Sequence, residues 1–224
     1  MSDETPTSVD PAALAALPVF PLPRVVLLPG LDLPLHIFEP RYRAMTRDAL
    51  ATHRALAVTM LGPQNGDTVG RPPMARTAGA GVIIEDHERP DGRFDIVVRG
   101  LHRVVLEELP REGLLYRRAR AIVLPDGLAA PSDRAAATAL LAIASQVATR
   151  IRQQKPDFEL PLNGVMSPGR VADVLAGMLV LEPDRRQEVL ETLDVARRLA
   201  IVNEEAVELF ARLVRDPDGH DFAH

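Results

Sequence analysis

Prolines crowd the stretch at residues 17–45, LPVFPLPRVVLLPGLDLPLHIFEPRYRAM, and limit its fold more than any other feature of the chain. The six prolines alternate with valine, leucine, isoleucine and phenylalanine. Because proline fixes φ and lacks a backbone N–H, it suits strand ends, edge strands and the first turn of a helix. The stretch therefore predicts two short strands, at 25–28 and 33–38, and then a helix with Pro40 near its first position.

The composition is that of an ordinary globular protein, with 224 residues, 46% of them hydrophobic and 25% charged. This length allows one large domain or two small ones. No run approaches the ~18 uninterrupted apolar residues of a membrane helix. The N-terminus is acidic and does not have the basic start of a signal peptide. We therefore expect a cytoplasmic protein that makes no membrane contact.

Several kinds of chemistry are excluded by residue counts. The chain has no cysteine, which removes disulfides, thiolate nucleophiles and cysteine-ligated zinc. The net charge of −5 provides no overall field that would attract nucleic acid. Lys155 is the single lysine, so a mechanism that requires a catalytic lysine has one candidate.

The sequence changes character near Pro125. Before it, short β-branched segments at 55–61, 81–98, 101–109 and 117–124 predict strands, with a loop rich in Gly and Pro at 62–73. After it, the apolar period becomes helical. We expect a flexible tail at 1–16, a barrel lobe at 17–125, a helical lobe at 126–215 and a second tail at 216–224.

A hairpin is the clearest local signal in the first lobe. Arg89-Pro90-Asp91-Gly92 suits a type I turn, which places His87 opposite Asp95 and Glu85 opposite Val97. Gly100 predicts a bulge or bend before the next strand. Since successive strand residues point to opposite faces, the hairpin sorts into two sets. The predicted core face holds Val82, Ile84, Phe94, Ile96 and Val98. The predicted outer face holds Glu85, His87, Arg93, Asp95 and Arg99.

Four helices are expected in the second lobe. Ser132 would cap the first, which Pro156 stops, and Ser167-Pro168 would open the second. The third begins near Pro183, and Asp194 would cap the fourth. Apolar residues at three- and four-residue steps give the fourth helix a buried stripe. The stripe consists of Val195, Leu199, Val202, Ala206, Leu209 and Leu213.

In residue identity as well as in hydrophobic pattern, the proline-rich stretch resembles the opening of the substrate-binding (N-terminal) domain of the Lon ATP-dependent proteases, "LP-x-FPL…PG…LPL-x-IFE-x-RY". The residues that carry this signature are Pro29, Gly30, Pro34, His36, Phe38, Glu39, Arg41 and Tyr42. The hairpin at 79–109 and the helices at 189–209 extend the resemblance over roughly residues 17–215.

This resemblance implies an α+β fold: a PUA-like β-barrel lobe followed by a C-terminal four-helix lobe. It also implies a non-enzymatic module that recognises the exposed apolar segments of an unfolded or client polypeptide, or that docks a partner protein. Binding would bury an apolar peptide in a groove between the lobes or add a strand to a barrel edge.

Catalytic motifs are absent from the sequence. It contains no G-x-x-x-x-G-K-[ST] phosphate loop and no G-x-S-x-G nucleophile turn. A Ser–Lys pair would have to join Lys155 to Ser145 or Ser167, outside any glycine-rich turn. We therefore expect no catalytic residue and no cofactor.

Histidines and carboxylates do not predict a metal site. His36 and Glu39 have an H-x-x-E spacing, but Pro40 starts the helix, so His36 belongs to the preceding strand. We interpret Glu39 as an acceptor for N–H groups at the helix start that pairs with Arg41 or Arg43. In Asp86-His87-Glu88, neighbouring strand side chains point apart and cannot converge on a metal.

RNA binding is the alternative, because PUA-like barrels include RNA binders. Arg111, Arg117, Arg118 and Arg120 cluster, but no aromatic residue lies between the last three of them to stack on bases. Within the polypeptide-binding hypothesis, the candidate contact residues are Glu85, His87, Arg99 and the 62–73 loop. An ordinary polar face is the competing interpretation of those three side chains.

Overall fold

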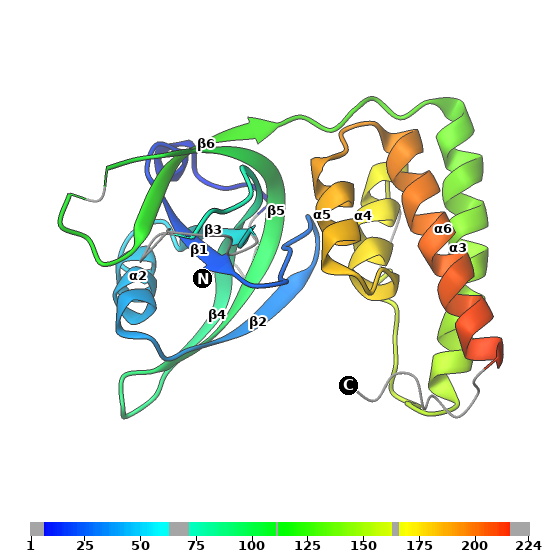
Figure 1. The fold of residues 1–224 in the computed structure, drawn as a ribbon, viewed down its shortest axis with the longest axis horizontal. Helices are drawn as coiled ribbons and strands as arrows, with labels where there is room; N and C mark the ends of the chain where they lie inside the picture. Colours follow the sequence, from blue (N-terminus) through cyan, green and yellow to red (C-terminus); the bar gives the residue numbers. More distant parts are fainter. Residues whose placement is uncertain (1–6, 63–71, 111, 163–165, 216–224) are drawn as a thin grey trace. The chain divides into compact units, whose positions relative to one another are not determined.

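The chain divides after Pro125 into two compact units, Met1–Pro125 and Asp126–His224 (Figure 1). The computed structural model describes residues 7–62, 72–110, 112–162 and 166–215. The first unit is a β-barrel with two helices, and the second consists of four helices. The mixed α+β fold predicted from the sequence is confirmed.

The described residues of the first unit form one sheet of six strands. They are β1 (Leu17–Leu22), β2 (Asp32–Ile37), β3 (Ala55–Met60), β4 (Thr77–Glu88), β5 (Phe94–Glu108) and β6 (Arg117–Leu124). Their order is β2-β5-β4-β3-β1-β6, and an additional β5–β6 pairing closes a ring of five strands. The long β5 pairs with β2 over 94–99 and with β6 over 103–108. Closure leaves β2 as a sixth strand on the outside of the ring, where Pro34 blunts its open edge.

The strand predicted at 25–28 is wrong, and β1 lies earlier in the chain. Leu27 and Leu28 are buried without strand pairing. Their carbonyls cross two glycines: a Cβ on Gly79 would lie 1.9 Å from the Leu27 oxygen, and one on Gly100 would lie 2.3 Å from the Leu28 oxygen. The segment therefore packs across β4 and β5 as irregular backbone. The predicted strand at 33–38 and the helix α2 (Pro40–Leu50) are confirmed.

The hairpin has the predicted turn and register near its tip. Gly92 has φ +76° and donates its N–H to the Arg89 carbonyl at 2.8 Å. His87 lies opposite Asp95, and Glu85 opposite Val97.

Two bulges change the predicted faces farther along the hairpin. One at Ile84 places Ile83 opposite Val98, so Ile83 joins Phe94, Ile96 and Val98 in one core cluster. Val82 and Ile84 pack in another cluster, which corrects their assignment to the face of Phe94. The second bulge, beside Gly100, bends β5 without ending it, so a single strand replaces the two that were expected.

The beginning of the chain differs from the predicted tail over 1–16. Residues 1–6 lie outside the described residues, and 7–16 pack on the barrel and include helix α1 (Pro11–Leu14). Val9 and Ala13 are buried in the barrel core. The predicted tail is therefore wrong at residues 7–16, because these apolar side chains cover one end of the barrel.

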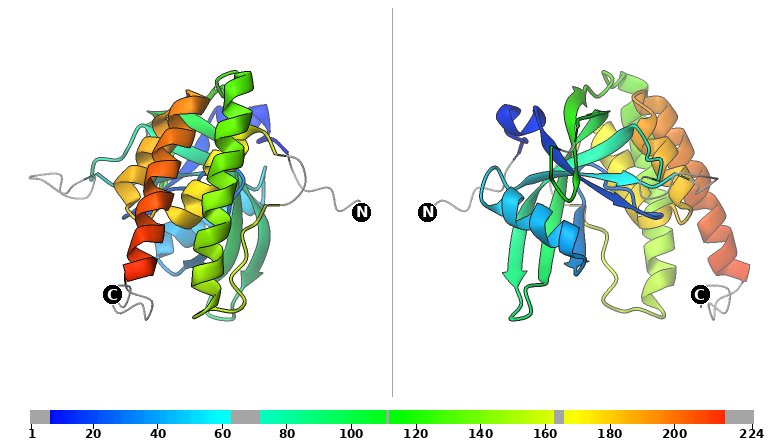
Figure 2. Two further views of the ribbon diagram at one scale, coloured as in Figure 1. Left: turned by 90° about the vertical axis from the view of Figure 1, so that its right-hand side faces the viewer. Right: turned by 60° about the vertical axis from the view of Figure 1, so that its left-hand side comes forward.

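The second unit contains α3 (Pro131–Arg152), α4 (Pro168–Leu179), α5 (Pro183–Glu191) and α6 (Val195–Arg215), shown from two sides in Figure 2. Caps by Ser167 and Asp194 are confirmed: Ser167 Oγ accepts from Arg170 N at 3.3 Å, and Asp194 Oδ1 from Arg197 N at 2.7 Å. The Ser132 cap is wrong, because the helix already begins at Pro131. All six residues of the predicted α6 stripe are buried.

Within the described ranges, none of the helices has both the length and the apolar character needed to cross a membrane.

Candidate functional site

The outer face of the β2–β5–β4 sheet carries the three side chains predicted to contact peptide. Glu85 and His87 are exposed on β4, beside β5. Arg99 makes a two-pronged ion pair with Asp32 on β2, Nε–Oδ1 2.7 Å and Nη2–Oδ2 2.6 Å. The sheet brings these residues to one polar face, as the register predicted. Their role in binding stays a prediction.

His36 belongs to the same polar face. Its Nδ1 lies 2.7 Å from Asp95 Oδ1, and Arg89 Nε donates to Asp95 Oδ2 at 2.6 Å. The Arg89 guanidinium, together with His36, lowers the pKa of Asp95 to about 2. Among the residues that the structure describes, no group of three His, Cys, Asp or Glu side chains could hold a metal ion. His36 is therefore part of an ion-pair network on the sheet surface.

Glu39 combines two structural roles at the start of α2. Its carboxylate pairs with Arg41, Nη2–Oε2 2.8 Å, as interpreted from the sequence. The helix N–H groups of Tyr42 and Arg43 are accepted by the Glu39 backbone carbonyl at 3.0 and 2.9 Å. The carboxylate makes no capping bond, so the expectation that it accepts those N–H groups is corrected.

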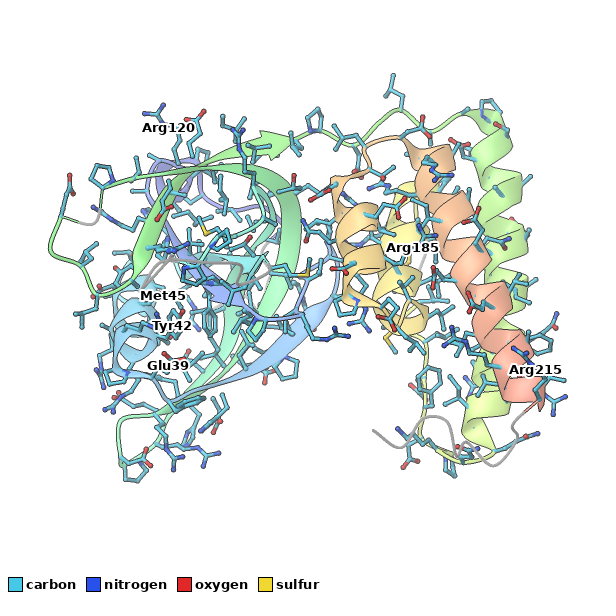
Figure 3. All side chains as sticks on the ribbon, viewed as in Figure 1. Glu39, Tyr42, Met45, Arg120, Arg185 and Arg215 are labelled. Atoms are coloured by element: carbon cyan, nitrogen blue, oxygen red, sulfur yellow. The ribbon has the colours of Figure 1, made fainter. Side chains whose placement is uncertain are left out.

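A pocket of about 120 Å³ opens beside this helix start in the barrel unit. Most of its lining comes from the end of β1, the start of α2 and the residues that lead into and begin β6; Leu61 and Pro72, between β3 and β4, complete it. Figure 3 labels Glu39, Tyr42 and Met45 at α2. The lining residues are Pro21, Leu22, Pro23, Glu39, Arg41, Tyr42, Leu61, Pro72, Leu115, Tyr116 and Arg117. The signature residues Glu39, Arg41 and Tyr42, interpreted from the sequence as architecture, thus also line a pocket.

Both tyrosines of the chain line this pocket, and both are held in place. The Tyr42 ring packs against Phe20 at a centroid distance of 4.4 Å, and the Arg41 guanidinium lies 4.4 Å over its centre. Tyr116 donates its O–H to Asp48 Oδ2 at 2.7 Å. Burial, with the nearby Asp48 carboxylate, raises the pKa of Tyr116 to about 12. The pocket walls are therefore ordered before any ligand arrives.

Exposed apolar residues mark the site. Leu115, which lines the pocket, is 61% exposed, and Phe38, directly before Glu39 in the chain, is 60% exposed. Pockets for drug-sized ligands occupy roughly 300–1,000 Å³, and this smaller pocket is of a size to accommodate one large side chain. Leu115 and Tyr116 were not predicted as site residues, because they lie far from the proline-rich stretch in the sequence.

A second pocket, of about 440 Å³, continues from the first. The two share Pro72 and Arg117, whose Nη2 donates to the Pro72 carbonyl at 2.9 Å. Together we call them the barrel groove. The second part is lined by Pro72, Pro73, Met74, Ala75, Arg76, Leu106, Glu107, Glu108 and Arg117. Most of the predicted 62–73 binding loop, residues 63–71, lies outside the described residues.

Comparison with known proteins places this geometry in a family. Residues 16–208 match the family model described as the ATP-dependent protease La (LON) substrate-binding domain. The Lon protease of Roseiflexus castenholzii is 30% identical over 200 residues, which cover 89% of this chain and 25% of that protein. The Lon protease of Paraburkholderia phytofirmans is 30% identical over 208 residues, 88% of this chain and 25% of that protein. The chain thus spans about a quarter of the length of these relatives.

Solved structures agree on the fold. The N-terminal domain of a Mycobacterium avium complex Lon protease superposes with a TM-score of 0.68 at 18% identity, covering 86% of this chain and 98% of that one. A Lon N-terminal domain protein from Xanthomonas campestris gives a TM-score of 0.56 at 25% identity, covering 83% and 95%.

Proposed function

The chain belongs to the family of the ATP-dependent protease La (LON) substrate-binding domain, and on that premise we propose that it is a non-catalytic module that binds exposed apolar segments of client or partner polypeptides. The observation that carries the proposal is the pocket bounded by Tyr42, Tyr116 and the exposed Leu115. An apolar side chain of a client would enter this pocket. The rest of its extended backbone would follow the barrel groove.

The energetics favour weak, repeated engagement. Full burial of one large apolar side chain contributes about 1.5–3 kcal/mol, whereas a Kd of 1 mM already requires roughly 4 kcal/mol. One pocket of this size therefore holds a client only briefly. Several apolar segments of the same unfolded chain would have to exchange in turn. Folded proteins, which bury such segments, would escape binding.

A charge placed at the pocket tests the proposal. In Leu115→Asp, a carboxylate replaces an exposed apolar side chain, so the stability of the fold should change little. The affinity for a fluorescent unfolded polypeptide, measured by anisotropy, should fall about tenfold, since each 1.4 kcal/mol is a factor of ten. The matched control is Ile122→Asp on β6, where the residue replaced is 46% exposed and does not line the pocket. Equal affinities for the two variants would contradict the proposal.

RNA binding is not supported by the arginine cluster. Arg111 lies outside the described residues. Arg118 pairs with Glu112 at 2.6 Å, and Arg120 lies 3.6 Å from Glu107. Neighbouring carboxylates thus offset the charge that phosphate groups would require. In the same anisotropy assay, a steep loss of affinity with added salt would be the signature of nucleic-acid binding. Apolar polypeptide binding should depend on salt only weakly.

A further inference from the structure

The first described residues of the chain, 7–16, cross one end of the barrel, and we call them the N-terminal strap. Val9 and Ala13 are 3% and 8% exposed, and they pack in a core cluster with Ala119 and Ala121 of β6. Helix α1 contacts β6, beside which it lies in Figure 1. The β1–β6 pairing stops at Leu17 and Ala119. The strap therefore covers the place where β6 continues beyond its partner strand.

Histidines hold the strap to the barrel. The Val9 N–H donates to His102 Nε2 on β5 at 3.4 Å, and Asp10 Oδ2 lies 3.1 Å from His53 Nδ1. In the described part of the chain, the other hydrogen bonds of the strap are local, such as Asp10 Oδ1 with Ala12 N. Two tertiary polar contacts thus support a small apolar contact area.

The Val9 contact requires a neutral imidazole. Nε2 can accept from a backbone N–H only when it carries no proton itself. Protonation would turn Nε2 into a donor that faces the Val9 N–H, which is also a donor. The hydrogen bond would then be lost in a half-buried position, where an unsatisfied donor is costly. We propose that the N-terminal strap is acid-sensitive: protonation of His102 releases residues 7–16 from the barrel end and uncovers the apolar side chains beneath them.

The burial of His102 favours the same response of the strap to acid. Burial lowers its pKa below the ordinary value of 6.5. A base with a lowered pKa in the closed state stabilises that state above pH 6.5, and this stabilisation is lost as the pH falls from 6.5 through the lowered pKa. Each unit of lowering makes opening tenfold easier at a pH below both values.

Few other charged side chains of the described residues face His102. Opposite His102, β4 presents Ala80 between two glycines, none of which titrates. Arg103, the next residue on β5, belongs to the other face of the strand. Helix α1 carries no charged residue. Within the described ranges, the ion pair of the strap joins Asp10 to His53.

The Asp10–His53 pair is the second polar contact between the strap and the barrel. Both side chains are exposed, 41% and 50%, and exposed ion pairs contribute little. The half-buried His102 contact therefore decides the net response.

Hydrogen exchange followed by NMR tests the proposal on the intact chain. Between about pH 7.5 and about pH 5.5, the range in which histidine titrates, the protection factors of the backbone amides of residues 9, 10 and 12–14 should fall roughly threefold or more. Protection factors corrected for intrinsic exchange are required, because free amides also exchange at pH-dependent rates. Amides of β4 should keep their protection. Unchanged protection of the strap would overturn the proposal.

Two variants identify the histidine responsible. In His102→Gln, the side-chain amide oxygen can accept from Val9 but does not titrate, so the pH response should disappear. In His53→Asn, where His102 is intact, the response should persist. A full response in His102→Gln would overturn the proposal. If that variant does not fold, the midpoint of the wild-type Val9 amide shift must coincide with the titration of the His102 ring, and different midpoints would equally overturn it.

Discussion

Tyr116 connects the pocket to helix α2 through one hydrogen bond, and its acid–base behaviour reports on that contact. Its hydroxyl is held by Asp48, and its ring lines the pocket. A phenol with a raised pKa in the folded state contributes stability that is complete below its unfolded pKa of about 10. This contribution is lost as the pH rises through that value toward about 12.

We therefore expect the free energy of unfolding to fall between about pH 10 and about pH 12 in the native chain. In Tyr116→Phe the fall should be smaller, because no phenol titrates at that position. Denaturant titrations at both pH values measure the difference. The single lysine keeps competing titrations few. Equal pH dependence in both proteins would contradict the assigned hydrogen bond.

Arg198 is a different kind of residue, a charge with no exposure to solvent. Its Nη1 lies 3.0 Å from Asp126 Oδ1 and 3.3 Å from Asp173 Oδ1, and the Asp173 side chain is 1% exposed. Removing one member of a buried pair leaves the other charge uncompensated, which costs about 3–5 kcal/mol. Arg198→Met should be destabilised by that amount in chemical denaturation.

The double variant Arg198→Met/Asp173→Leu provides the control. An apolar pair in place of a buried ion pair is often neutral or stabilising, so the double variant should recover most of the lost free energy. If it is as unstable as the single variant, the loss comes from packing and not from an unpaired charge.

At the scale of elements, the barrel depends on a close crossing of backbones. The 27–28 segment passes over Gly79 on β4 and Gly100 on β5, where no Cβ would fit. Arg54, with φ +56°, supports the bulge near Ile83: its carbonyl accepts from Ile83 N at 2.7 Å, and its Nε donates to Ile83 O at 2.9 Å. These contacts determine where the strands bend and hence which side chains face the core.

Gly79→Ala should therefore be severely destabilised, by about 4 kcal/mol or more, as expected when a core position is overpacked against rigid backbone. Thermal or denaturant unfolding measures it. The control is Gly62→Ala, where the added Cβ would meet Pro73 atoms at 3.4 Å or more. It should change the stability by less than about 1 kcal/mol. Similar losses in the two variants would contradict the crossing.

The molecule as a whole consists of two units, each of which contains its own secondary-structure partners. All six strands of the barrel, including the closing β5–β6 pair, lie within Met1–Pro125. The helices α3 to α6 lie within Asp126–His224, where Arg185 joins α5 to α6 by an ion pair with Glu205 at 2.7 Å (Figure 3).

We predict that residues 1–125 fold alone. The fragment is large enough to bury a core, and the pairing of its strands involves no residue of the helices α3 to α6. Dispersed amide resonances and cooperative unfolding of the isolated fragment would be the expected result, with residues 126–224 as the companion fragment. A fragment that lacks cooperative unfolding would contradict this prediction. Retained polypeptide binding by residues 1–125 would further assign the site to the barrel groove.

Much of the architecture could be predicted from local chemistry. Pro40, Ser167-Pro168 and Asp194 mark helix starts because capping depends on a few neighbouring residues. The α6 stripe follows from the helical period, and the hairpin register near its tip follows from one turn. Faces farther from the turn could not be predicted, since a bulge at Ile84 reverses the alternation, and that bulge depends on Arg54, thirty residues earlier.

The sequence by itself determined the family, the α+β order and most of the helix and strand positions. These depend on short-range patterns and on the proline-rich motif shared with the Lon substrate-binding domain. The tertiary structure alone decided the pocket and the strap. Tyr42 and Leu115 line one pocket only after the barrel closes, and Val9 reaches His102 only when the strap crosses the barrel end. Such contacts join residues more than seventy positions apart, and no local pattern specifies which distant side chains will become neighbours.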